Sequence, residues 1–152
     1  GANSLQGSIP SAIGQLQQLT FLELNVNALQ GSIPSAIGQL QQLTFLELNV
    51  NALQGSIPSA IGQLQQLTLL TVGSNSFTGT VPQELTTLKH LNYIVLEANP
   101  HLTGKLPAFN FSQFTSCCAM DGDPFTCPLP AGANTCVGGP GCGGKLPPPT
   151  CK

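Results

Sequence analysis

Residues 5–28 read LQGSIPSAIGQLQQLTFLELNVNA, and the same letters recur at residues 29–52. A third copy starts at Leu53 and keeps the wording as far as Thr68, after which it changes to LLTVGSNS. A fourth copy, FTGTVPQELTTLKHLNYIVLEANPH, starts at Phe77, keeps only the pattern and gains one residue near Pro100. Because self-similarity at a fixed period in this range is typical of stacked repeats, the sequence predicts a solenoid built from 24-residue coils.

Within one unit, the segment Leu22-Glu23-Leu24 alternates apolar and polar residues at period two, which predicts a short strand. The equivalent segments of successive coils, stacked in register, would form a parallel sheet with a spacing of roughly 4.8 Å. We expect the leucines to point inward and the residues between them to lie on the concave face. The leucines predicted to be buried are Leu22, Leu24, Leu46 and Leu48.

The rest of each coil should return the chain to the next strand. An asparagine recurs where the chain leaves the sheet, and it could satisfy unpaired backbone groups along the stack. These residues are Asn27, Asn51, Asn75 and Asn99. We interpret residues 31–34 as a turn, and residues 35–37 as one short helical or 3₁₀ turn on the convex side that Gly38 ends.

The unit pattern LxxLxxLxLxxNxLxGxIPxxLGxL resembles the plant-type leucine-rich repeat of receptor ectodomains and polygalacturonase-inhibiting proteins. The resemblance covers roughly residues 1–107. The consensus positions of one unit are filled by Asn27, Leu29, Gly31, Ile33, Pro34, Gly38 and Leu40. The resemblance implies a curved and twisted α/β solenoid with a parallel concave β-sheet and 3₁₀ segments on the convex side. It also implies a role in binding proteins or glycans.

Composition excludes several classes of function. Charged residues make up only 7% of the chain, with a net charge of −2, so no basic surface is available for nucleic acid. No apolar run is long enough for a membrane span. The cysteines all lie in a short tail, which predicts disulfides and an oxidising compartment, and hence a secreted protein. They are Cys117, Cys118, Cys127, Cys136, Cys142 and Cys151.

We divide the chain into a solenoid of about four coils at residues 1–108 and a Cys/Pro/Gly-rich C-terminal cap and tail at residues 109–152. Three disulfides are expected, among fifteen possible pairings, and the adjacent Cys117 and Cys118 should have different partners. Zinc binding is the alternative, but no cysteine–histidine spacing fits it. Four phenylalanines of this region should cover the leucines of the last coil. They are Phe109, Phe111, Phe114 and Phe125.

Two short motifs of the tail have a chemical interpretation. Residues 110–112 form an N-glycosylation sequon, in which Asn110 would carry the glycan. Residues 121–123, Asp-Gly-Asp, resemble part of a calcium loop but lack its further ligands, so a plain turn is expected.

The N-terminus aligns with the end of a repeat, because residues 1–3 correspond to residues 25–27. The chain therefore begins in mid-coil, and no N-terminal cap is recognisable. An uncovered end coil leaves apolar surface that monomers rarely tolerate. We expect the N-terminal end to be truncated, with either further repeats or another molecule docked end-on.

The outward residues of the predicted strands form three columns along the concave face, and these are the candidate partner-binding residues. The first column is Phe21, Phe45, Leu69 and Tyr93; the second is Glu23, Glu47, Thr71 and Val95; the third is Asn25, Asn49, Gly73 and Glu97. The aromatic side chains could anchor a sugar or a protein, or they could pack on one another. The two stacked glutamates would repel one another unless a cation or a basic partner intervened, although solvated carboxylates tolerate such a distance.

Catalysis finds little support in the sequence. The only imidazoles, His90 and His101, have no nucleophile at a recognisable spacing, so we expect a non-enzyme without a cofactor or a metal. A regular threonine column at residues 20, 44 and 68 could bind ice, but it breaks at Asn92.

Two classes of function therefore remain. The first is a non-catalytic extracellular scaffold or structural protein that self-associates end to end or laterally, or belongs to a longer array. Identical repeats with surfaces rich in glutamine and serine favour this class, because selection for a distinct ligand usually diversifies exposed positions. The alternative is an extracellular recognition module that binds a protein or carbohydrate on the concave face.

Overall fold

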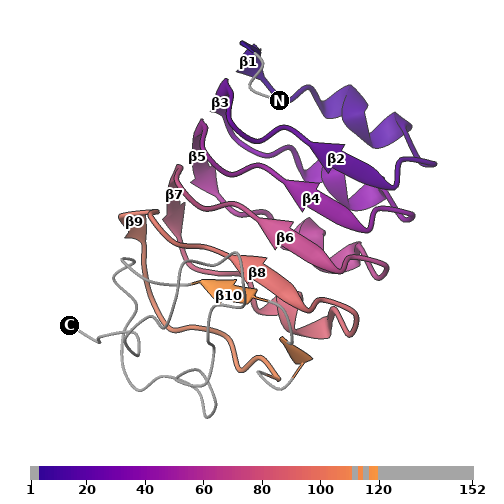
Figure 1. Ribbon diagram of the computed structural model, residues 1–152, viewed down its shortest axis with the longest axis vertical. Coiled ribbons are helices and arrows are strands. Elements are labelled where there is room, and N and C mark those ends of the chain that lie inside the picture. The colour runs from indigo at the N-terminus through magenta and orange to yellow at the C-terminus, as the bar shows by residue number, and fades with distance from the viewer. Residues whose placement is uncertain (1–3, 111–112, 115–116, 120–152) are drawn as a thin grey trace.

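The structure is a computed structural model that describes residues 4–110, 113–114 and 117–119. The described residues form one stack of coils, with the N-terminal coil at the top of the view in Figure 1 and the last coil at the bottom. Each full coil contributes one strand to each of two parallel sheets and one short 3₁₀ helix. The predicted leucine-rich solenoid, its parallel sheet and its 3₁₀ segments are confirmed.

The first sheet is the one predicted for the concave side, and we keep the name concave sheet for it. Its order is β10-β8-β6-β4-β2, with β2 (Phe21–Glu23), β4 (Phe45–Glu47), β6 (Leu69–Thr71), β8 (Tyr93–Val95) and β10 (Cys117–Ala119). The second sheet has the order β1-β3-β5-β7-β9, with β1 (Gln6–Ser8), β3 (Ala28–Gly31), β5 (Ala52–Ser56), β7 (Ser76–Gly79) and β9 (His101–Leu102). The 3₁₀ helices are η1 (Ser11–Gln15), η2 (Ser35–Gln39), η3 (Ser59–Gln63) and η4 (Gln83–Thr87).

The hydrophobic core lies between the two sheets and the helices, and the inward leucines fill it in layers. Leu46 and Leu48 are fully buried, and Leu22 is 8% exposed. The prediction is wrong for Leu24, which is only partly buried. The reason is that no coil of the described chain packs on the outer side of this first layer. The same effect separates Leu16, which is 52% exposed, from its equivalent Leu40 at 0%.

The recurring asparagine bonds the backbone of adjacent coils, as predicted. The Asn75 Oδ1 accepts a hydrogen bond from the backbone N–H of Leu53 at 3.0 Å. Its Nδ2 donates to the carbonyl oxygens of Leu48 at 3.0 Å, Val72 at 3.0 Å and Gly73 at 3.1 Å. Since Asn75 is only 6% exposed, these bonds satisfy groups that water does not reach.

The second sheet was not predicted, and the turn predicted at residues 31–34 begins inside its strand β3. The strand β3 already includes Gly31, and the asparagine side chain is part of the cause. The Asn51 Oδ1 accepts from the backbone N–H of Leu29 at 3.0 Å, which holds this segment extended beside the next coil. The chain then turns at Gly31, whose φ of +75° suits a residue without a Cβ.

The prediction that Gly38 ends the helix is also wrong, because η2 continues to Gln39. The glycine has a steric role instead. A Cβ at Gly38 would lie 2.6 Å from the Gln63 Oε1 and 2.7 Å from the Ala60 carbonyl oxygen. The absence of a side chain therefore lets η2 and η3 approach closely.

At the C-terminal end, aromatic residues cover the last coil. Phe109 is 4% exposed, and its ring meets that of Phe114 edge-on, with centroids 5.7 Å apart. The Gln113 Nε2 donates to the carbonyl oxygens of Leu88 at 3.2 Å and Leu91 at 2.8 Å. The predicted covering role is confirmed for Phe109 and Phe114.

The remaining tail predictions lie outside the described residues. They concern Phe111, Phe125, the side chains of the six cysteines, and residues 121–123. The disulfides and the division at residue 108 stay predictions. The described strand β10 extends the concave sheet, with Cys118 opposite Ile94.

Replacing Asn75 by alanine should destabilise the solenoid, because it leaves the buried N–H of Leu53 without its acceptor and takes one of two donors from each of three carbonyl oxygens. An unsatisfied buried group costs about 1–3 kcal/mol, so we expect a loss of about that size in the free energy of unfolding. Urea denaturation followed by circular dichroism measures it. Asn27→Ala is the matched control, because Asn27 is less buried and bonds only Leu5, Leu24 and Asn25. Equal losses in the two variants would contradict the argument.

Candidate functional site on the concave sheet

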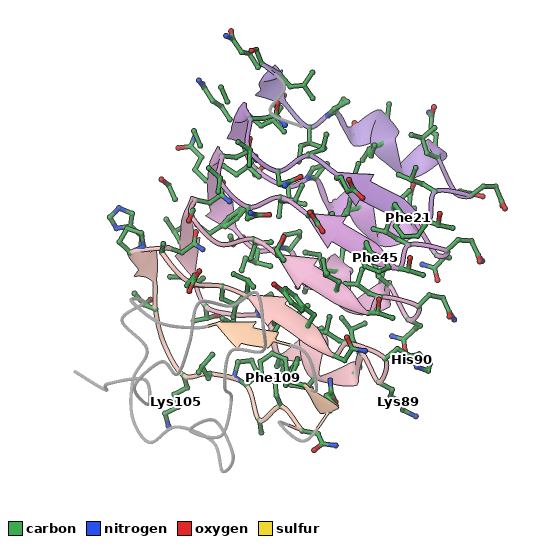
Figure 2. All side chains as sticks on the ribbon, viewed as in Figure 1. Phe21, Phe45, Lys89, His90, Lys105 and Phe109 are labelled. Carbon is green, nitrogen blue, oxygen red and sulfur yellow. The ribbon has the colours of Figure 1, made fainter. Side chains whose placement is uncertain are left out.

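The strand pairing places the predicted columns in register. Phe21 pairs with Phe45, Phe45 with Leu69, and Leu69 with Tyr93. The rings of Phe21 and Phe45 stack with centroids 4.9 Å apart and planes inclined by 27°. Figure 2 labels both rings, one above the other at the edge of the concave sheet. Stacking leaves Phe21 53% exposed, so the pair packs on itself and still presents an apolar surface.

The two glutamates of the second column are also in register, with Glu23 opposite Glu47. Burial of the carboxyl group raises the pKa of Glu47, and the negative charge of Glu23 raises it further. Both effects disfavour the ionised form, because charge is removed from water and placed next to like charge. In the described part of the chain, neither carboxylate is paired with a lysine or a histidine.

The third coil departs from this pattern. Thr71 replaces the glutamate and is only 7% exposed, and its hydroxyl donates to the Asn49 Oδ1 at 2.9 Å. Gly73 is buried, and a Cβ there would meet the Val95 Cγ1 at 3.0 Å and the Glu97 Cγ at 3.5 Å. The carboxylate-rich part of the concave sheet is therefore confined to the first two coils.

The fourth coil places Tyr93, Val95 and Glu97 at the other end of the columns, where all three are partly buried. Asn25 and Asn49 are likewise partly buried. The concave sheet thus brings all the predicted columns onto one surface, but its two halves differ in chemistry.

Sequence reasoning missed one pair of exposed residues beside these columns. Val26 and Val50 follow the third column, are 43% and 45% exposed, and have φ angles of 55° and 58°. A positive φ is a clear outlier for a β-branched residue. The signal in the sequence was a valine between two asparagines, at a position where the later coils have Ser74 and Ala98.

The structure also locates the other residues singled out in the sequence. The Thr44 hydroxyl donates to the Thr20 carbonyl oxygen at 2.9 Å, and the Thr68 hydroxyl to that of Thr44 at 3.0 Å. Two hydroxyls of the proposed ice-binding column therefore bond the backbone. His90 and His101 are both exposed, and Asn110, the predicted glycan acceptor, is exposed as well.

Two further kinds of site are absent from the described residues. No group of three or more His, Cys, Asp or Glu side chains there could hold a metal ion. None of the described helices is long and apolar enough to cross a membrane.

Comparison with known families places the chain in a class. The family described as "Leucine-rich repeat region" matches residues 2–109. The chain therefore belongs to the leucine-rich repeat family. No curated protein sequence matches it significantly.

Solved structures give the plant context. The chain is similar to the ectodomain of the receptor kinase GASSHO1/SCHENGEN3 from Arabidopsis thaliana, solved in complex with CASPARIAN STRIP INTEGRITY FACTOR 2, at 34% identity and a TM-score of 0.82. That match covers 88% of this chain and 16% of the receptor chain. The plant peptide hormone receptor RGFR1 in complex with RGF2 matches at 29% identity and a TM-score of 0.80, over 84% of this chain and 20% of that one. This chain thus spans a fifth or less of these receptor chains.

Replacing Glu47 by glutamine should remove an unfavourable charge. Since the folded-state pKa of Glu47 lies above 4.5, the native protein binds this proton more tightly than the unfolded chain does. The stability of the wild-type protein should therefore fall as the pH rises from 4.5 through the raised pKa. Relative to the wild type, Glu47→Gln should gain stability over that range and lose the gain below pH 4.5. Thermal melting at several pH values measures this, with Glu84→Gln as control. A difference between Glu47→Gln and wild type that is independent of pH would contradict it.

Proposed function

We propose that this chain is an extracellular protein-recognition module that binds a peptide or protein segment on the concave sheet. The observation that carries the proposal is the concave sheet of the first two coils. A rigid strand pair there exposes stacked aromatic rings beside carboxylates that have no partner within the described chain. Groups fixed on a parallel sheet lose little conformational entropy on binding, which favours recognition.

The related structures support a protein partner rather than a sugar. Two of these structures are complexes of a receptor with RGF2 or with CASPARIAN STRIP INTEGRITY FACTOR 2, and RGFR1 is a plant peptide hormone receptor. A protein partner is therefore the first candidate for this chain, and a carbohydrate is the alternative.

The proposed role is non-catalytic and outside the cell. The described imidazoles lie apart from the concave columns. His90 is in the loop before β8 (Figure 2), and His101 is on β9 of the second sheet. Secretion agrees with the cysteine-rich composition of the tail and with the ectodomain relatives.

Selection of a random peptide library displayed on phage tests the proposal without a known ligand. Peptides enriched on the wild-type protein should lose binding to Leu69→Arg, because the new side chain would occupy the middle of the concave sheet. Gln54→Arg is the matched control, since it places the same group on the exposed side of β5 in the second sheet. We expect a loss of at least about tenfold in affinity for Leu69→Arg and little change for the control. A selection that enriches no peptide dependent on Leu69 overturns the proposal.

A second candidate function, self-association through the first coil, has one observation in its favour. Leu5, Leu16 and Phe21 are 44%, 52% and 53% exposed on the outer side of this coil, where the equivalent Leu40 is fully buried. Another copy of the chain docked end-on would cover this apolar surface.

This candidate predicts a concentration-dependent mass by light scattering, weakened in Leu16→Ser but not in Gln18→Ser. Both substitutions introduce the same small polar residue at exposed positions of the first coil. The candidate fails if the wild type is strictly monomeric at high concentration and the amides of residues 19–24 exchange as slowly as those of residues 43–48.

A further inference from the structure

The first two coils present the same set of side chains twice, one coil above the other. We call this set the duplicated patch, and it consists of Phe21, Glu23 and Val26 with their equivalents Phe45, Glu47 and Val50. Register pairing stacks the two rings and the two carboxylates. Coils of a parallel sheet repeat at about 4.8 Å, so each residue type forms a close pair across the strands.

The duplicated patch has a definite order along the strands. The aromatic pair comes first, the carboxylate pair two residues later, and the exposed valines three residues after that. At about 3.3 Å per residue, the carboxylates lie roughly 7 Å from the rings and 10 Å or less from the valines. The acidic pair is therefore flanked on both sides by exposed apolar groups.

Charge complementarity indicates the partner. The described residues include four carboxylates, and three of them, Glu23, Glu47 and Glu97, belong to the columns of the concave sheet. The described lysines, Lys89 and Lys105, lie outside those columns; Lys89 is in the loop before β8 and Lys105 follows β9 (Figure 2). A cationic group between Glu23 and Glu47 would replace their repulsion by attraction.

The exposed valines are a second feature of the patch. Their left-handed backbone belongs to the repeat, because Ser74 and Ala98 share it, but the apolar side chain does not. In the third and fourth coils, where Thr71 and Val95 stand in place of the glutamate pair, Ser74 and Ala98 take this position. Exposed valine thus occurs only in the described coils that carry the carboxylate pair.

We propose that the duplicated patch binds a lysine or arginine side chain of an extended protein segment, flanked by apolar residues two to three positions away. The cation would lie between Glu23 and Glu47, while its aliphatic stem packs against the rings. The flanking apolar residues would contact Phe21 and Phe45 on one side, and Val26 and Val50 on the other. This inference rests on the proposed function and names the chemistry that the partner must have.

The test compares peptide selections on three proteins: the wild type, the double variant Glu23→Gln/Glu47→Gln, and the control Glu84→Gln. Glutamine keeps the size of glutamate, and Glu84 is an exposed glutamate on η4, away from the concave sheet. We expect the wild type and Glu84→Gln to enrich peptides with lysine or arginine and apolar neighbours at the stated spacing. The double variant should enrich peptides without that basic residue.

Affinity measurements then isolate the charge. Replacing the basic residue of a selected peptide by a neutral residue of similar size should weaken its binding to wild type by about tenfold. The same replacement should have little effect on binding to the double variant. The inference would be overturned if the peptides enriched on the wild-type protein lacked basic residues. It would also be overturned if the replacement weakened peptide binding equally on the wild type and the double variant.

A metal ion is the competing occupant of the carboxylate pair. Calorimetric titration with calcium chloride alone tests it: submillimolar binding to the wild type that the double variant lacks would also overturn the inference. These failures differ from failure of the proposed function. If the proposed function fails, peptide binding will survive Leu69→Arg. If only this inference fails, binding will still depend on Leu69 but will not depend on Glu23 and Glu47.

Discussion

The asparagine ladder is the constraint on which the rest of this solenoid depends. Each coil must leave the concave sheet, turn, and begin a strand of the second sheet, and that path takes backbone groups out of both ladders. One amide side chain per coil restores their bonds. Asn75 does this for groups of three segments, the start of β5, the exit of β4 and the exit of β6. A carboxylate could not replace it, because the carbonyl oxygens require a donor.

Much of the fold could be predicted because the 24-residue repeat determines the structure of every coil. The leucines, the concave strands and the buried asparagines occur at fixed places in the unit, so one pattern predicts every coil. Local chemistry was harder to read. The second sheet was missed because Ala28–Gly31 carries a weak strand signal, and the bond from the Leu29 N–H to the Asn51 side chain is a contact between coils. Gly38 was mistaken for a terminator because its partners, Ala60 and Gln63, belong to the next coil.

The candidate site was predicted as three columns along the concave face. In the structure the members from the first two coils differ in exposure from Thr71 and Gly73 of the third coil. The sequence supplies the register, which pairing confirms from Phe21 to Tyr93. It does not supply burial, and so Thr71 and Gly73 could not be distinguished from the exposed members of their columns. The valines were overlooked because a positive φ at a β-branched residue contradicts local preference. Exact repetition, which favoured a structural scaffold at first, also doubles every exposed group of the first coil at a fixed separation.

The direction of the side-chain hydrogen bonds gives the array a polarity. The donors of Thr44, Thr68 and Asn75 all reach back to carbonyl oxygens of the preceding coil. The Asn75 side chain also accepts from the preceding coil, at the Leu53 N–H. Each coil therefore completes the bonding of the one before it, and removal of a coil leaves both a donor and acceptors of the preceding coil without these partners. Gln113 reaches back to Leu88 and Leu91 in the same direction, and so supplies donors to carbonyl oxygens of the last coil.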